Sequence, residues 1–285
     1  MDAEISAGQA AANRKFDIEF QLLVDAIYHR YHYDFRGYAA ASLRRRLRAA
    51  LSRFQCESVS QLQDRVMHEP KIFPALLDHL TVQVSEMFRD PAHFRALREQ
   101  VVPLLRTYPS LKVWVAGCSS GEEAYSLAIL LREEGLLSRV LIYATDINPH
   151  TLQRAEAGIY SIDRIAGFTI KHRESGATSS LSDYYTAAYG RAILDKSLRE
   201  RIVFSDHSLA TDSVFAEVHL VSCRNVLIYF KRELQDRALG LFRDSLCRHG
   251  FLGIGSKESL RFTSVAGAFR AFVAKERIYQ KGDPA

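Results

Sequence analysis

Three carboxylates that follow a glycine loop are the first residues whose types and spacing could support chemistry. The loop runs from Gly117 to Gly121, Glu122 and Glu123 come directly after it, and Asp146 follows about 25 residues later. A carboxylate at roughly this distance from a glycine loop accepts hydrogen bonds from the ribose hydroxyls of a nucleotide cofactor. The pattern therefore favours a site for a molecule that contains a nucleoside.

The spacing of the glycines narrows the choice of cofactor. Backbone amides close around a pyrophosphate when the loop reads G-x-G-x-x-G, and around a nucleoside triphosphate when it reads G-x-x-x-x-G-K-[ST]. This loop reads G-x-x-x-G and has neither spacing. A nucleoside without phosphates fits it better, and S-adenosylmethionine is the common cofactor of that kind.

Each of these carboxylates also has a purely structural explanation. Ser120 and Glu123 have the S-x-x-E spacing of a capping box, which satisfies the first amides of a helix. Glu122 suits the positive end of a helix dipole, and Asp146 could cap a helix that begins near Pro149. Spacing alone leaves cofactor binding and helix capping equally open.

The elements that must position these residues are two strands and the helix between them. Val113–Ala116 and Val140–Ala144 are apolar runs typical of buried strands, and apolar residues at helical spacing lie between them until Gly135. Further apolar runs predict strands near residues 202–204, 218–221 and 251–254, an amphipathic helix over 231–247, and closing strands at 272–273 and 277–280. Strands that alternate with helices predict a doubly wound α/β domain.

A basic stretch stands out in the first part of the chain, where the apolar residues recur at helical spacing. Between Leu43 and Phe54 there are five arginines and no acid. On a helical wheel Arg45 and Arg48 lie opposite the apolar face, with Arg44 beside them. Such a run is either a solvated helix surface or a docking surface for an acidic partner.

Composition limits the class of protein. The chain has 285 residues, of which 47% are hydrophobic and 25% charged, as in soluble globular proteins of one or two domains. It has no apolar run that could span a membrane and no hydrophobic signal core, so we expect a cytoplasmic protein. The four cysteines and ten histidines show no metal-ligand spacing, so no metal is expected. The formal net charge of +5 indicates an acidic partner.

Three blocks, in this order and spacing, resemble the CheR family of chemotaxis receptor methyltransferases. They are LTVQVSEMFRD at residues 80–90, AGCSSGEEAYSLA at 116–128 with YATDIN at 143–148, and SCRNVLIYF at 222–230. The resemblance implies the α/β fold of a class I S-adenosylmethionine-dependent methyltransferase, with a Rossmann-like doubly wound sheet and a small antiparallel β-subdomain. A small all-α N-terminal domain is expected to precede it.

The same resemblance suggests where the domains begin and end. We expect a mobile tail over residues 1–15, the helical domain over 16–80, and a linker that contributes to the site over 81–91. The methyltransferase domain is then expected over 92–285, with the β-subdomain inserted at about 167–200. Residues 167–182 are rich in Ser, Gly and Thr and are expected to form a loop.

Individual positions also gain roles from the resemblance. The implied cofactor-binding residues are Gln83, Ser85 and Arg89 in the linker, Glu123 and Asp146 around the glycine loop, and Ser208, Leu209, Cys223, Arg224 and Asn225 further on. Arg89 and Tyr229 are expected to act in catalysis, Tyr229 by facing the substrate. Arg89 could hold a carboxylate of the substrate or of the cofactor, or instead pair with Glu86 or Asp90 on the surface. Ser208 stands where the family usually has asparagine, which should weaken contacts to adenine.

The implied reaction is methyl transfer from S-adenosylmethionine to a glutamate side chain in the cytoplasmic domain of a chemoreceptor. A glutamate is already ionised near neutral pH, so a direct displacement needs no general base. Arg44, Arg45 and Arg48 are expected to dock the acidic receptor, and we expect a monomer with no nucleic acid partner and no membrane insertion. A methyltransferase for nucleic acid or an amine, or a non-catalytic S-adenosylmethionine-binding module, is the alternative.

Overall fold

The computed structural model describes the backbone of residues 2–282 and the side chains of residues 13–282. Its internal contacts divide the chain into two compact units. A helical unit runs to Val82 and also contains Tyr229–Leu234, and a sheet-containing unit comprises Gln83–Ile228 and the chain from Gln235 onward. Among the described residues, no helix has the length and apolar character needed to cross a membrane.

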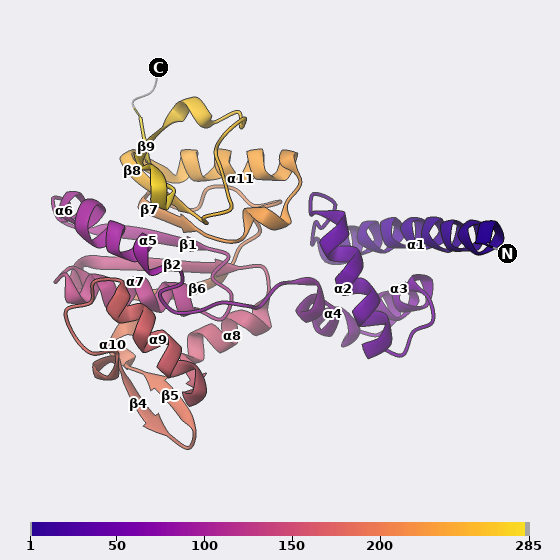
Figure 1. The fold of residues 1–285 in the computed structure, drawn as a ribbon, viewed down its shortest axis with the longest axis horizontal. Helices are drawn as coiled ribbons and strands as arrows, with labels where there is room; N and C mark the ends of the chain where they lie inside the picture. Colours follow the sequence, from indigo (N-terminus) through magenta and orange to yellow (C-terminus); the bar gives the residue numbers. More distant parts are fainter. Residues whose placement is uncertain (1, 283–285) are drawn as a thin grey trace. The chain divides into compact units, whose positions relative to one another are not determined.

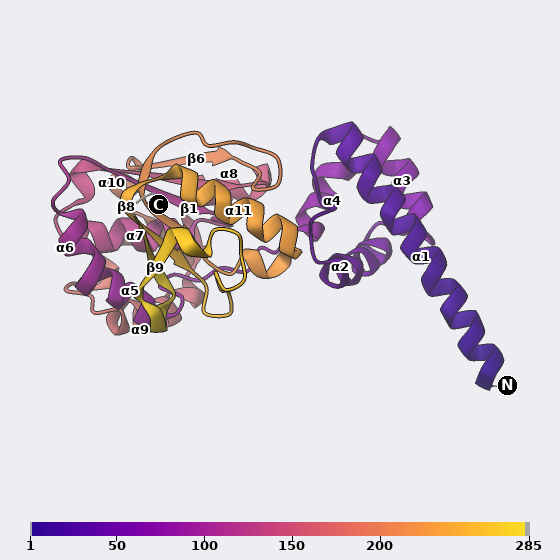
Figure 2. The same ribbon diagram turned by 90° about the horizontal axis from the view of Figure 1, so that it is seen from above.

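Four helices build the helical unit: α1 (Asp2–Tyr31), α2 (Ala40–Arg53), α3 (Val59–His68) and α4 (Ile72–Leu80). Helix α1 packs against α3 and α2 packs against α4, and their apolar stripes bury Leu23, Ile27, Leu43, Leu47, Leu62 and Leu76. In Figures 1 and 2 the first half of α1 extends past the other three helices.

The segment expected as a mobile tail, residues 1–15, is the first half of α1, apart from Met1, which lies outside the described residues. The segment is rich in alanine, which has the highest intrinsic helix propensity. That propensity explains a helix where no apolar stripe predicts one.

A segment from much later in the sequence completes the helical unit. Residues 229–234 lie against the turn before α2, where the amide of Lys231 donates to the carbonyl oxygen of Gly37 (2.7 Å). A Cβ atom on Gly37 would lie 2.9 Å from a methyl group of Leu234, so the close approach requires glycine. The helical domain predicted from the sequence, residues 16–80, did not include this segment.

The second unit is organised around a mixed seven-stranded sheet with the order β6-β2-β1-β7-β8-β10-β9 (Figure 1). The strands are β1 (Leu111–Ala116), β2 (Val140–Asp146), β6 (Ile202–Asp206), β7 (Val218–Cys223), β8 (Leu246–Ile254), β9 (Phe269–Val273) and β10 (Ile278–Lys281). Strands β6, β2, β1, β7 and β8 pair in parallel, and β10 is antiparallel to its neighbours β8 and β9. The predicted class I methyltransferase sheet, including its two closing strands, is confirmed.

Helices connect these strands. They are α5 (Pro91–Ala96), a π-helical turn (Leu97–Val101), α6 (Val102–Leu105), α7 (Glu122–Glu133), α8 (Pro149–Ala157), α9 (Ile162–Glu174), α10 (Lys196–Arg199) and α11 (Arg232–Ser245). Short 3-10 turns cover Leu137–Arg139, Leu181–Tyr184, Leu227–Tyr229, Ala266–Ala268 and Ala274–Glu276. The parallel crossovers place the carboxyl ends of β1, β2, β6 and β7 along one edge of the sheet.

A second, three-stranded antiparallel sheet forms the β-subdomain. Its order is β3-β5-β4, with β3 (Ile159–Ser161), β4 (Tyr185–Ala188) and β5 (Arg191–Leu194), and Figure 1 shows it beside α9 and α10. Its first strand begins at residue 159, before the expected start near 167. Helix α9 also occupies much of the segment expected as loop, because Ile165, Phe168 and His172 recur at helical spacing and are buried.

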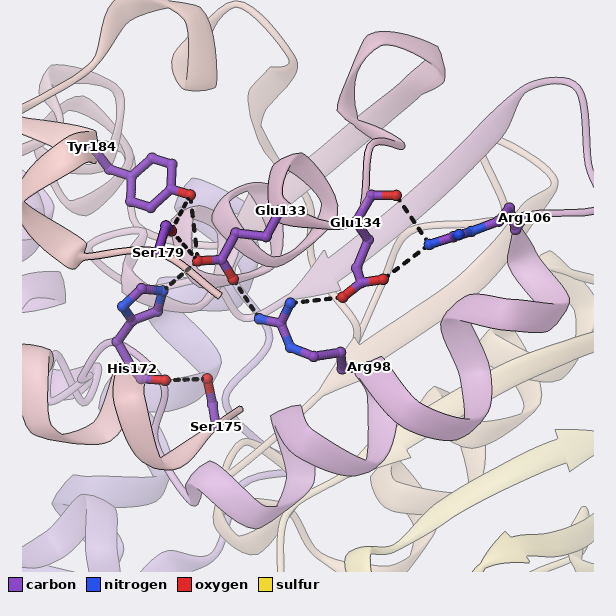
Figure 3. Close-up of polar contacts among 8 residues, drawn as sticks. All are labelled: Arg98, Arg106, Glu133, Glu134, His172, Ser175, Ser179 and Tyr184. Atoms are coloured by element: carbon purple, nitrogen blue, oxygen red, sulfur yellow. Dashed lines mark hydrogen bonds and ion pairs between the residues drawn. The ribbon is translucent and has the colours of Figure 1, made fainter. Parts of the chain in front are cut away.

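A buried charge network ties α7, which starts at the glycine loop, to the elements around it (Figure 3). The side chain of Glu133, at the end of α7, is 1% exposed and accepts hydrogen bonds from Arg98 (2.5 Å), His172 (3.0 Å) and Ser179 (2.5 Å). Burial opposes ionisation, but these hydrogen bonds lower the pKa of Glu133 to about 2. Arg98 also pairs with Glu134 (2.8 Å), so the π turn, α7, α9 and the loop before β4 are joined.

Candidate functional site

The glycine loop after β1 is held in a tight conformation by its backbone. The amides of Gly117 and Cys118 both donate to the carbonyl oxygen of Thr145 (2.8 and 2.9 Å). Gly117 and Gly121 have φ angles of 74° and 90°, a region that favours glycine. A Cβ on Gly117 would lie 2.5 Å from a methyl group of Val226, so this position has no room for a side chain.

Asp146 ends β2 and its carboxylate bridges two loops. Its oxygens accept hydrogen bonds from the amides of Ser119 (2.9 Å) and Asn148 (3.1 Å). Burial raises the pKa of Asp146, and these amide hydrogen bonds partly counteract the rise. The cap of α8 is Asn148, whose side chain accepts from the amides of the first turn, so the capping explanation for Asp146 is wrong.

The two glutamates at the start of α7 have different surroundings. The N-cap of α7 is Gly121, and no side chain caps the helix, so the capping box considered as the alternative for Ser120 and Glu123 does not form. Glu122 is fully buried and is paired with Arg164 (2.8 Å). Glu123 instead reaches β7, where it accepts a hydrogen bond from the hydroxyl of Ser222 (2.6 Å).

Arg224, just beyond β7, joins Glu123 to the linker. Its side chain is 1% exposed and its guanidinium lies 3.3 Å from the Glu123 carboxylate. It also donates to the carbonyl oxygen of Arg89 (2.8 Å) and to the carboxylate of Asp90 (2.8 Å). A buried arginine with this many acceptors fixes the linker backbone against the end of the sheet.

Arg89 itself stands between two residues with strained backbones. Phe88 and Asp90 have φ angles of 51° and 55°, which are uncommon for residues other than glycine. Within the described part of the chain, the Arg89 side chain makes no hydrogen bond or ion pair, because Glu86 pairs with Lys171 and Asp90 pairs with Arg224. The surface pairing considered for Arg89 is therefore not observed, and its guanidinium is available to a ligand.

The other linker residues face the helices of the same unit. The side-chain oxygen of Gln83 accepts a hydrogen bond from Arg154 in α8, and the carbonyl oxygen of Ser85 accepts one from Arg164 in α9. These contacts hold residues 83–85 beside the helices that follow β2 and β3.

Two further positions lie at the carboxyl ends of β6 and β7. Ser208 and the buried Leu209 follow β6, next to Asp146, since the amide of His207 donates to the Asp146 carbonyl oxygen (3.2 Å). Cys223 is fully buried, and burial raises the pKa of its thiol well above the usual range, so it is a neutral packing residue. In the described residues no cluster of three or more His, Cys, Asp or Glu side chains could hold a metal ion.

Glu258 is a residue of this region that the sequence analysis missed. The residue is 4% exposed, and its carboxylate accepts hydrogen bonds from the amides of Gly255 (2.6 Å), Asn225 (3.1 Å) and Ile228 (3.3 Å). Burial raises its pKa, against the effect of these amides. It fixes the turn after β7 that carries Arg224 and Asn225, and no motif or spacing in the sequence marks it.

The predicted S-adenosylmethionine fits the residues that meet at this edge of the sheet. The carboxylates of Glu123 and Asp146 suit a ligand that carries an ammonium group, a sulfonium and ribose hydroxyls. Among the buried polar atoms that have no hydrogen-bond partner in the described residues, several belong to this region: the Ser119 hydroxyl, Asn225 Oδ1, His207 Nδ1 and Arg224 Nε. Buried polar groups are normally satisfied, so these atoms indicate a polar ligand.

The remaining predicted residues belong to the helical unit. Tyr229 lies there and not in the sheet-containing unit. In α2, Arg44 pairs with Asp17 of α1 (3.0 Å), so the basic stretch is partly neutralised by an acid from another helix. Arg48 lies over the ring of Phe16 (4.3 Å), and Arg45 is exposed.

Comparisons with known proteins agree on one family. The family model described as "CheR methyltransferase, SAM binding domain" matches residues 83–277, and "CheR methyltransferase, all-alpha domain" matches residues 18–81. The "Putative methyltransferase Cher3" of Pseudomonas putida is 59% identical over 95% of this chain and 99% of its own length. A chemotaxis protein methyltransferase of Listeria innocua is 31% identical, over 80% of this chain and 84% of its own. Chemotaxis protein methyltransferase 1 of Vibrio cholerae is 30% identical, over 76% and 80%.

Proposed function

The chain belongs to the CheR methyltransferase family, and we propose that it methylates glutamate side chains in the cytoplasmic domain of chemoreceptors. The products are the glutamate 5-O-methyl ester and S-adenosylhomocysteine, and the reaction serves chemosensory adaptation in the cytoplasm. The family model supports an S-adenosylmethionine-dependent methyltransferase, and the names of the relatives support a chemotaxis substrate.

The observation that carries the proposal is the environment of Arg89. Its backbone is fixed by Arg224 and flanked by two strained residues, yet its side chain has no protein partner in the described residues. Backbone strain of this kind costs on the order of 1–3 kcal/mol and is typical of functional sites. A fixed backbone with an unpaired guanidinium suits the binding of a carboxylate.

We propose the following contacts between the protein and the cofactor. S-adenosylmethionine supplies the electrophilic methyl group. Asp146 accepts hydrogen bonds from its ribose, Glu123 and Arg224 bind its methionine portion, and Ser208 and Leu209 lie against its adenine. Further contacts to the cofactor come from Gln83, Ser85, Cys223 and Asn225.

The nucleophile is a glutamate carboxylate, which is ionised near neutral pH without help from a base. A bond forms between its oxygen and the methyl carbon while the carbon–sulfur bond breaks, and the electron pair of that bond stays on sulfur. No proton moves. The protein therefore has to align the carboxylate and exclude water, which are the roles proposed for Arg89 and Tyr229.

The test is methyl transfer from labelled S-adenosylmethionine to receptor-bearing membranes, followed by mild alkali. Carboxyl methyl esters hydrolyse and release volatile methanol, whereas methylated nitrogen and nucleic acid keep the label. We expect released methanol, and we expect an Arg89→Ala variant to lose it while Arg95→Ala, in α5 of the same unit, keeps it. Alkali-stable label would support a nucleic acid or amine substrate. Cofactor binding without any transfer to the cognate receptor would support a non-catalytic module.

A further inference from the structure

Phe88 precedes Arg89, the residue proposed to bind a carboxylate, and it is completely enclosed by the sheet-containing unit. It is 0% exposed, and its backbone has a φ angle of 51°. A positive φ angle is rare for a residue with a large side chain and persists only where surrounding contacts enforce it. The contacts that hold Phe88 therefore also decide where the Arg89 side chain points.

Helix α7 holds the backbone of Phe88. The amide of Phe88 donates a hydrogen bond to the Ser126 hydroxyl (2.9 Å), and that hydroxyl donates to the carbonyl oxygen of Glu122 (2.7 Å). Ser126 is 0% exposed, so water does not compete for these bonds. They fix the linker to the helix that begins directly after the glycine loop.

The ring of Phe88 is held by two other rings. Phe94 in α5 makes an edge contact with it, with 5.3 Å between the ring centres, and His172 in α9 makes a tilted contact at 4.7 Å. His172 is 1% exposed, and its Nε2 atom lies 3.0 Å from the Glu133 carboxylate (Figure 3). The buried charge network thus fixes the imidazole ring on which Phe88 packs.

The other neighbour of Arg89 is fixed by different contacts. The Arg224 guanidinium donates to the carbonyl oxygen of Arg89 and to the carboxylate of Asp90, whose φ angle is 55°. Each residue with a positive φ angle therefore has its own anchor. Together the anchors constrain the Arg89 backbone from both ends, while its side chain makes no hydrogen bond or ion pair within the described part of the chain.

We propose that Ser126 and His172 are positioning residues, which act through Phe88 and hold Arg89 in the conformation that binds a carboxylate. Ser126 fixes the backbone of Phe88, and His172 fixes its ring. A guanidinium binds a carboxylate through parallel hydrogen bonds, so its orientation matters as well as its charge. The inference rests on the proposed function, because it assumes that Arg89 acts in methyl transfer.

His172→Gln tests the ring contact, because glutamine can still donate to Glu133 but has no ring to pack on Phe88. We expect the rate of alkali-labile methyl transfer to receptor-bearing membranes, measured where the variant is fully folded, to fall about three- to tenfold. Ser179→Ala is the control, since it removes another hydrogen bond to Glu133 and leaves the ring contact intact. This control should keep the rate even if its melting temperature falls.

Ser126→Ala tests the backbone anchor, and it also decides the question if His172→Gln does not fold. It leaves the buried amide of Phe88 without an acceptor, and we expect the rate to fall by about tenfold. A double variant separates positioning from a general loss of structure. Arg89→Lys keeps the charge but not the planar fork. In that background Ser126→Ala should lower the rate by less than about a further twofold, with its effect on the melting temperature unchanged.

Two results would overturn the inference. One is a rate that falls in the variants, the Ser179→Ala control included, only as far as the melting temperature falls. The other is a Ser126→Ala effect that is as large in the Arg89→Lys background as in the unsubstituted protein. Failure of the proposed function looks different, because the unsubstituted protein then forms no alkali-labile methyl ester on the receptor at all.

Discussion

The two carboxylates at the start of α7 have different partners, although they are adjacent in the sequence. Glu122 is fully buried and neutralised by Arg164, so it supports the fold. Glu123 reaches the end of β7 and, with Asp146, places negative charge at the edge of the sheet where ligands of α/β folds bind. The side-chain partners, and not the residue type, separate the structural acid Glu122 from Glu123, the acid proposed to bind the cofactor.

Asp146→Asn should weaken cofactor binding without unfolding the protein. The amide keeps the shape of the side chain but loses the charge that strengthens hydrogen bonds to ribose hydroxyls, and its NH2 group cannot accept from one of the two backbone amides that Asp146 binds. The expected effect is about 1.5–3 kcal/mol, or roughly 10- to 100-fold in affinity. Isothermal titration with S-adenosylmethionine measures it. Asp206→Asn is the matched control, since Asp206 is the register partner of Asp146 on β6 and is exposed. Equal affinities in the two variants would contradict the assignment of Asp146.

At this scale the sequence predicts which residues meet but not how their charges are paired. Glu123, Asp146, Arg224 and Asn225 were all predicted, because they belong to motifs that end strands. Glu258 and the Arg44–Asp17 pair were not, because they depend on contacts between segments distant in the chain. Contacts also excluded helix capping by Glu123 and Asp146, because the N-cap residues are Gly121 and Asn148.

The loop between β1 and α7 works as an element only with glycine at its first position. Gly117→Ala would place a Cβ 2.5 Å from Val226 and also strain a positive φ angle. We expect at least about a tenfold loss of S-adenosylmethionine affinity, measured by titration, because the loop must move away from Asp146.

Gly135→Ala is the control, because it tests the free-energy cost of a positive φ angle without a steric contact. Gly135 ends α7 with a φ angle of 68°, but a Cβ there meets nothing within 4 Å. This variant should lose about 1–2 kcal/mol of stability with unchanged cofactor affinity. If both variants bind the cofactor equally well, the contact with Val226 does not shape the site.

The network around Glu133 should make the free energy of unfolding depend on pH in the acidic range (Figure 3). The folded state lowers the pKa of Glu133 from 4.5 to about 2, so the stabilisation is complete above the pKa of the unfolded state and is lost as pH falls from about 4.5 towards 2. Glu133→Gln leaves His172 without its acid and leaves Arg98 with Glu134 alone, so it should lower the free energy of unfolding by about 3–5 kcal/mol near neutral pH.

Chemical denaturation at several pH values checks this prediction. The difference in free energy of unfolding between the unsubstituted protein and Glu133→Gln should shrink as the pH falls, because the unsubstituted protein then loses the same charge. Glu134→Gln is the control, since that side chain is more exposed (18%) and its loss should cost about 1 kcal/mol or less. If this difference does not change with pH, the Glu133 carboxylate is not the ionised group that stabilises the network.

Elements whose apolar residues recur at a clear strand or helix spacing were predicted well, and the errors have physical causes. The strands and the amphipathic helix α11 follow from buried apolar runs and stripes. Helix α9 was missed because Gly167 and nearby polar residues hide a stripe that becomes buried only against the rest of the unit. The first half of α1 was missed because helix propensity, and not an apolar period, accounts for it.

At the scale of the whole molecule, positive charge should speed the encounter with an acidic receptor. The net charge is +5, and Arg45 and Arg48 are exposed on α2. Arg45→Glu with Arg48→Glu should raise the KM for the receptor by about tenfold or more, leave S-adenosylmethionine affinity unchanged, and reduce the dependence of the rate on salt. Arg243→Glu, on α11 and beside Asp244, is the control. Receptor kinetics that match the control would show that docking does not use α2.

The segment 229–234 shows what the sequence could not reveal about domain organisation. It follows the β7 motif in the chain, yet it belongs to the helical unit through Lys231, Gly37 and the Tyr38–Phe230 bridge. Sequence blocks mark domains as continuous stretches, whereas packing assigns each residue to the core that buries it.

The most direct test of the central claim is to locate the transferred methyl group. Purified receptor is incubated with the protein and S-adenosylmethionine, digested, and examined by mass spectrometry before and after mild alkali. The proposed function predicts methyl groups on glutamate side chains, absent after alkali and absent when Arg89→Ala replaces the unsubstituted protein. Methyl groups on lysine, arginine or the amino terminus, stable to alkali, would contradict it.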